Sequence, residues 1–99
     1  MTMENNDLVR KQVLKKAVGY ICSDRQAEYG TPEENFTAIA KLWSCWLDKE
    51  ISAHDVAILM TLLKIGRMQT GAPKDDTYID ACGYLAIGAE IVLNNGGIK

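Results

Sequence analysis

Two adjoining stretches decide the fold: residues 55–67 read DVAILMTLLKIGR, and residues 74–84 read KDDTYIDACGY. Both predict helices, because neither shows the two-residue alternation of a strand and their apolar residues recur at helical spacing. Residues 71–73, Gly-Ala-Pro, lie near the junction and favour a tight turn. The two stretches therefore predict a helical hairpin in which the end of one helix lies beside the start of the next.

Helix signals continue outward from this hairpin. Thr31 is followed by Pro32 and Glu34, which is a capping pattern, and Ser52 with Asp55 repeats it. Apolar residues at helical spacing also follow the polar first residues of the chain. We therefore expect an all-α fold, a four-helix bundle with short connections that forms oligomers through helix packing. Its helices are expected at residues 7–30, 31–50, 52–70 and 75–93.

The predicted core draws on all four helices. Trp43 and Trp46 are expected inside it, as aromatic residues of an amphipathic helix usually are. Cys82, Ala86 and Ala89 form a ridge of small residues that lets another helix approach closely. Tight packing within the chain and a subunit interface both explain that ridge, so oligomerisation is expected but its surface stays open.

Composition limits the class of protein. The chain has 99 residues, enough for a single domain over residues 1–99, with a flexible start at 1–6 and a frayed tail at 95–99. A net charge of −2 argues against binding a nucleic-acid polymer. Neither a bilayer-spanning apolar run nor a signal peptide is evident. The three cysteines are read as buried thiols in a reducing compartment, which indicates a cytoplasmic location.

The charged residues of the hairpin are the first candidates for a site. Lys64 and Arg67 share a helix face, and so do Asp76 and Asp80. Arginine and lysine suit a phosphate, whereas paired carboxylates suit Mg²⁺, with Asp55 as the third candidate ligand. The alternative is structural: the acids favour the helix N-terminus, and Asp80 pairs with Lys64 or Arg67 across the hairpin.

Other polar and aromatic residues are weaker candidates for the ligand. Arg25 and Tyr29 stand where the first helix gives way to the second. Asn35 could hydrogen-bond a base or ribose, although an asparagine here is more often solvated. Tyr84 could stack on a base at the wall of a pocket.

The residues that carry a family resemblance lie between positions 20 and 92. They are Arg25, Tyr29-Gly30, Asn35-Phe36, Leu42-Trp43, Asp55-Val56, Leu63-Lys64-Ile65-Gly66-Arg67, Asp75-Asp76, Asp80 and Gly83-Tyr84. This pattern resembles a family of small phage and prophage proteins that is similar to the MazG-like all-α nucleotide pyrophosphohydrolases and to phage nucleotide-modification-associated domains.

The resemblance implies an oligomeric helical bundle that binds nucleoside phosphates, usually through Mg²⁺. Its catalytic pattern pairs an E-x-x-E helix with an E-x-x-D helix. Asp76 and Asp80 match the second half loosely, and they would be the catalytic acids if the chain is an enzyme. Glu33 and Glu34 have no acid three residues later, so the first half is poorly matched, and hydrolysis is less expected than binding.

Three functions follow. The leading hypothesis is a phage nucleotide-binding protein that sequesters a host immune signal, a phosphorylated or cyclic nucleotide, without turnover. The second is a Mg²⁺-dependent nucleoside triphosphate pyrophosphohydrolase, with Asp55 or Glu34 completing the site formed by Asp76 and Asp80. The third is a structural or protein-interaction bundle, in which the charges only pair with one another.

Overall fold

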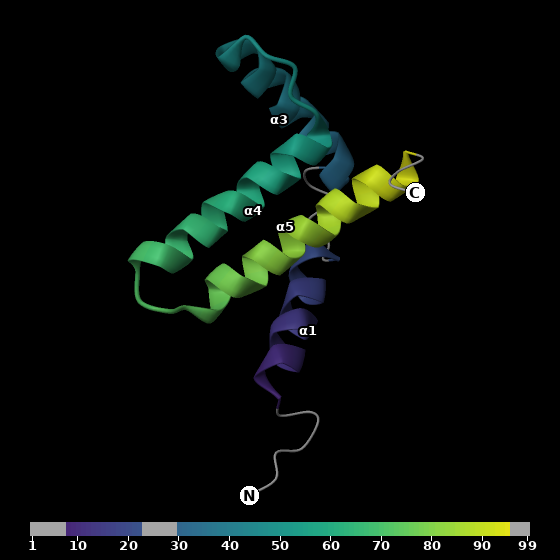
Figure 1. Ribbon diagram of the computed structural model, residues 1–99. Helices are drawn as coiled ribbons and strands as arrows, with labels where there is room; N and C mark the ends of the chain where they lie inside the picture. Colours follow the sequence, from purple (N-terminus) through teal and green to yellow (C-terminus); the bar gives the residue numbers. More distant parts are fainter. Residues whose placement is uncertain (1–7, 23–29, 96–99) are drawn as a thin grey trace, which may run out of the picture.

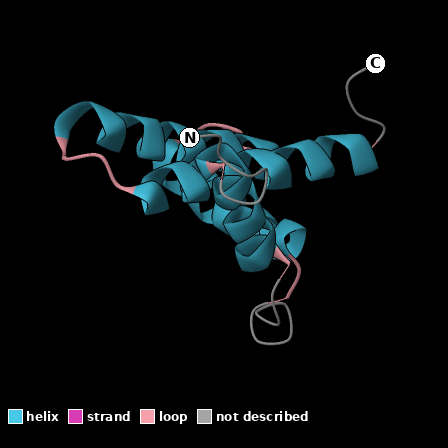
Figure 2. Cartoon of the chain, turned by 90° about the horizontal axis from the view of Figure 1, so that it is seen from below, coloured by secondary structure: helices cyan, strands magenta, loops and turns pink. Residues whose placement is uncertain are grey.

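The computed structural model describes residues 8–22 and 30–95, and every regular element within them is a helix (Figure 2). The predicted all-α fold with four helices is therefore confirmed for this part of the chain. The predicted flexible start at residues 1–6, and the tail beyond residue 95, lie outside the described residues. The helices are α1 (Val9–Ile21), α3 (Pro32–Leu47), α4 (Ala53–Thr70) and α5 (Asp75–Asn94).

Side-chain caps fix the starts of α3 and α4. The Thr31 hydroxyl accepts a hydrogen bond from the Glu34 backbone N–H at 3.1 Å and donates one to the Glu34 carboxylate. Ser52 and Asp55 form a full capping box, with bonds of 2.9 and 3.0 Å. Both helices thus begin where the sequence predicted, because these side chains satisfy backbone donors that have no partner inside the helix.

The α4–α5 hairpin is the centre of the molecule (Figure 1). Val56 and Ala57 on α4 are fully buried. A Cβ added to Gly88 of α5 would lie 3.1 Å from the Ala57 Cβ, so the two backbones approach closely there. Because the two helices pack this tightly, their facing side chains keep fixed positions along the helix axes. This packing positions the charged side chains described below.

The other two helices pack on different members of the hairpin. On α5, Ile79 is buried. Gly83 of α5 contacts Ile21 of α1 so closely that a Cβ added to Gly83 would lie 2.9 Å from the Ile21 Cγ2. On the other side, α3 buries Phe36 and Ala40 against α4 and α5. Because α1 packs mainly on α5 and α3 mainly on α4, the hairpin is the common support of the fold.

This arrangement is more open than the predicted four-helix bundle. Figure 1 shows α1 and α3 leaving opposite sides of the hairpin, and the extensive helix contacts of the described residues do not include an α1–α3 pair. The reason is geometric, since the two helices dock on different partners and point away from each other.

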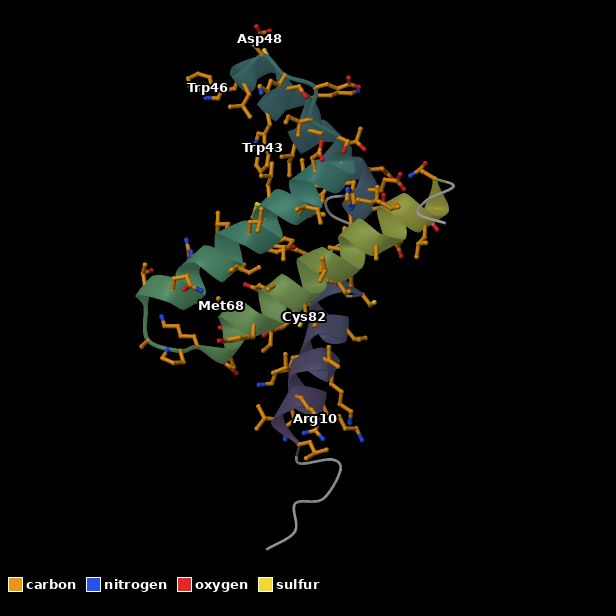
Figure 3. The ribbon with its side chains drawn as sticks, viewed as in Figure 1. Arg10, Trp43, Trp46, Asp48, Met68 and Cys82 are labelled. Carbon is orange, nitrogen blue, oxygen red and sulfur yellow. The ribbon has the colours of Figure 1, made fainter. Side chains whose placement is uncertain are left out.

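Several predicted core residues are exposed for the same reason. Trp46 is 89% exposed, because the last turn of α3 extends past α4, whereas Trp43 points toward α4 and packs against the core (Figure 3). The thiols of Cys22 and Cys45 are free but exposed, which corrects the prediction that they are buried. Other apolar residues of α1 and α4 are also exposed: Val9, Val18, Tyr20, Leu59 and Leu63.

Candidate functional site

One ion pair joins the two helices of the hairpin. The Lys64 Nζ lies 3.0 Å from the Asp80 Oδ2, and the two side chains are 17% and 34% exposed. Lys64 precedes Met68, labelled in Figure 3, by one turn of α4, and Asp80 lies just before Cys82 on α5. The folded hairpin thus brings together one predicted cation and one predicted acid, in a partly desolvated seam where charge attraction is stronger than in water.

The second predicted cation and acid remain outside this pair. Arg67 is exposed and makes no ion pair with another described residue. Asp76 is also exposed, and its backbone N–H donates to the Asp75 carboxylate at 2.9 Å. The guanidinium of Arg67 therefore keeps its donors available on the α4 side of the seam.

The start of α5 holds an ion pair that the sequence did not indicate. Lys16 of α1 lies 3.5 Å from the Asp75 carboxylate, and the side chains are 55% and 64% exposed. Sequence alone gave no signal for it, because the pair depends on how α1 crosses α5. A pair this exposed contributes little to stability.

Asp55 lies far from the other two predicted metal ligands. Its carboxylate accepts the Ser52 backbone N–H at the start of α4, nine residues before Lys64, which is about 13 Å along the helix. Within residues 8–22 and 30–95, no three His, Cys, Asp or Glu side chains are grouped so as to hold a metal ion. Of the three predicted metal ligands, only Asp76 and Asp80 share a helix face, and Mg²⁺ binding there stays a prediction.

The remaining predicted ligand residues are spread over the fold. Tyr84 is half-buried one turn after Asp80, and its ring centroid lies 6.2 Å from that of Phe36. Asn35 is exposed in the first turn of α3. Arg25 and Tyr29 lie outside the described residues. Of the six predicted ligand residues, Lys64, Arg67 and Tyr84 thus belong to the hairpin.

The hairpin charges can bind an anion. The Lys64 ammonium, which has three donors, forms an ion pair with Asp80, and Arg67 on the next turn offers a planar fork of donors that matches a phosphate. A neighbouring carboxylate opposes a bare anion at this place, so the available charge lies toward Arg67. The described site is a partly buried lysine and an exposed arginine beside an acidic helix.

Comparison with known proteins places this helical domain among phage proteins. A domain family of unknown function, DUF6378, matches residues 12–92, and the chain belongs to that family. It is 43% identical to the gene 55 protein of Mycobacterium phage D29 over 74 residues, which are 75% of this chain and 49% of that protein. It is 36% identical to the gene 55 protein of Mycobacterium phage L5 over 76 residues, 76% of this chain and 49% of the relative.

The chain therefore spans about half the length of the curated relatives it matches. No solved structure matches it. The family description and the relatives' names state no activity and no MazG-like fold, so the phage relationship is confirmed and the MazG-like resemblance stays a prediction. In the described part of the chain, none of the helices combines the length and apolar character needed to cross a bilayer.

Proposed function

We propose that this domain binds a phosphorylated nucleotide on the α4–α5 hairpin and holds it without hydrolysis. The observation that supports this proposal is the placement of two cations one turn apart, with Lys64 fixed by Asp80 at 3.0 Å and Arg67 left exposed. A phosphate recognised by Arg67 would gain charge-assisted hydrogen bonds, and Lys64 would add a nearby positive charge. The role that follows is sequestration of a host signalling nucleotide, linear or cyclic, by a phage protein.

Binding without turnover is favoured over hydrolysis by the position of the acids. Asp76 and Asp80 lie on α5, and Asp55 is held in the capping box at the far end of α4. A metal-dependent hydrolase needs carboxylates that converge on the ion and on the attacking water. The pyrophosphohydrolase alternative would need further acids that the described hairpin does not supply.

A structural role is the second candidate, and a specific contact favours it. Asp80 already neutralises Lys64, as expected of a pair whose purpose is to join α4 to α5. On this alternative, Arg67 is a solvated surface residue. Replacing Arg67 would then leave the stability almost unchanged, and no nucleotide would alter the melting temperature.

Ligand retention separates the two candidates. The protein is incubated with a panel of linear and cyclic nucleotides, freed of unbound ligand and denatured, and the released compounds are identified by mass spectrometry. We expect one class of nucleotide to be released intact. We also expect Arg67→Ala to weaken its binding about 10- to 100-fold, because a hydrogen bond to a charged group contributes about 1.5–3 kcal/mol.

Lys41→Ala is the matched control, since Lys41 is an exposed cation on α3 outside the hairpin. It should leave the affinity unchanged. If no nucleotide is retained, or if Lys41→Ala weakens binding as much as Arg67→Ala does, binding at the hairpin is refuted. Release of a hydrolysed product in the presence of Mg²⁺ would favour the pyrophosphohydrolase instead.

A further inference from the structure

The helix α4 is apolar on the side that faces away from α5. Leu59, Leu62, Leu63 and Gly66 recur at i, i+3, i+4 and i+7, so they form one face, here called the outer face of α4. The three leucines are 40%, 53% and 44% exposed. A helix that is apolar on both sides is usually buried on both sides. Over the part of α4 that lies below α3 in Figure 1, however, no other described helix runs along this side.

Gly66 is the second observation. It lies in the interior of α4, where glycine is the least favourable residue apart from proline. A Cβ built on it would meet nothing within 4 Å, so the packing of the described chain gives no reason for a glycine. A glycine on an exposed helix face does allow a second helix backbone to approach closely.

We propose that the outer face of α4 pairs with the outer face of α4 in a second copy of this chain, with the two helices antiparallel. The charges of α4 favour that occupant. Antiparallel pairing centred near residue 61 brings Asp55 at one end level with Arg67 of the second copy, and symmetry repeats this at the other end. Each copy therefore meets the opposite charge at both borders of the leucine face.

The other hairpin helix does not offer this complementarity. The exposed apolar residues of α5 include Tyr78 and Leu85, but its only charges are four acids, Asp75, Asp76, Asp80 and Glu90. Self-pairing of α5 would set acids against acids, which is unfavourable. The charge pattern thus selects α4 over the ridge of small residues on α5.

This pairing leaves the proposed anion site accessible. Asp55 already accepts the Ser52 N–H, and Arg67 lies at the border of the outer face rather than at its centre. With five donors, the guanidinium can face Asp55 of the second copy and still reach solvent. The inference does not depend on nucleotide binding, because it rests on the leucines, Gly66 and the order of charges along α4.

The test is the mass of the full chain in solution, measured by sedimentation and light scattering over a range of micromolar concentrations. We expect the unmodified chain to sediment at twice its 11.0 kDa. Leu62→Glu should raise the dissociation constant on the order of 100-fold, because two carboxylates then face an apolar partner across the two-fold axis. Leu85→Glu on α5 is the matched control, since both leucines are 53% exposed, and it should stay dimeric.

Gly66→Leu separates close packing from mere apolar attraction. It enlarges the apolar surface, so a loose hydrophobic association would become stronger. In the proposed dimer the added side chain blocks the approach of the second helix, and we expect dissociation with unchanged helical circular dichroism. The proposal is overturned by a monomeric unmodified chain, by a Leu62→Glu protein that stays dimeric, or by dissociation in Leu85→Glu alone.

Discussion

The Lys64–Asp80 pair should couple α4 to α5 more strongly than any exposed pair does. Its side chains are 17% and 34% exposed, between a buried pair, whose disruption destabilises by about 3–5 kcal/mol, and a surface pair, which contributes about 0–1 kcal/mol. We therefore expect Asp80→Asn to lower the free energy of unfolding by about 1–2 kcal/mol. The loss arises because Lys64 remains partly desolvated without its counter-charge.

A double-mutant cycle isolates this pair. Lys64→Met, Asp80→Asn and the double variant are unfolded in urea at one protein concentration, followed by circular dichroism, and the coupling free energy is taken from the cycle. We expect a coupling of about 1 kcal/mol. It should shrink in high salt by less than that of a surface pair, since partly buried charges are screened less.

The Lys16–Asp75 pair is the internal reference, because it also joins a lysine and an aspartate on neighbouring helices. Its atoms are 3.5 Å apart, and its side chains are 55% and 64% exposed. The cycle of Lys16→Met and Asp75→Asn should give a coupling within about 0.3 kcal/mol of zero. Equal coupling energies for the two pairs would refute the expectation that partial burial between α4 and α5 strengthens the Lys64–Asp80 ion pair.

Three further changes test the packing. Trp43→Ala should lower the free energy of unfolding by about 2–3 kcal/mol in urea titrations, and Trp46→Ala by less than about 0.5 kcal/mol, because only the first indole packs on the core; equal losses would contradict the orientation of α3. Ser52→Ala should lower it by about 1 kcal/mol through loss of the capping box, and an unchanged free energy of unfolding would contradict that cap. Gly83→Val should detach α1 from α5 by forcing a side chain into Ile21, seen as faster amide exchange confined to α1; unchanged exchange in α1 would count against this docking.

The local structure could be predicted from the sequence because its signals are short-range. Thr31 and Ser52 mark the starts of α3 and α4 through hydrogen bonds to residues three positions away. The position of Lys64 opposite Asp80 could be predicted as well, since a short turn after a helix fixes which residues of the next helix lie opposite those of the first.

The arrangement of the helices could not be predicted in the same way. The apolar residues of α1 and α3 indicate that each helix packs on something, but not on which partner, so a closed bundle was expected. Trp46 shows the limit most clearly: its spacing along α3 matches that of core residues, yet α3 extends beyond α4 and leaves the indole 89% exposed. Likewise, the distance of Asp55 from Asp80 depends on antiparallel packing over many residues, which spacing along the chain does not reveal.

The most direct test of nucleotide binding is mass spectrometry of the small molecules released when protein purified from phage-bearing cells is denatured. Binding at the hairpin predicts an intact phosphorylated nucleotide in the unmodified protein, far less of it in Arg67→Ala, and an unchanged amount in Lys41→Ala. A preparation that releases no nucleotide and retains none from a supplied panel would contradict the proposal. The hairpin charges would then serve only to join α4 to α5.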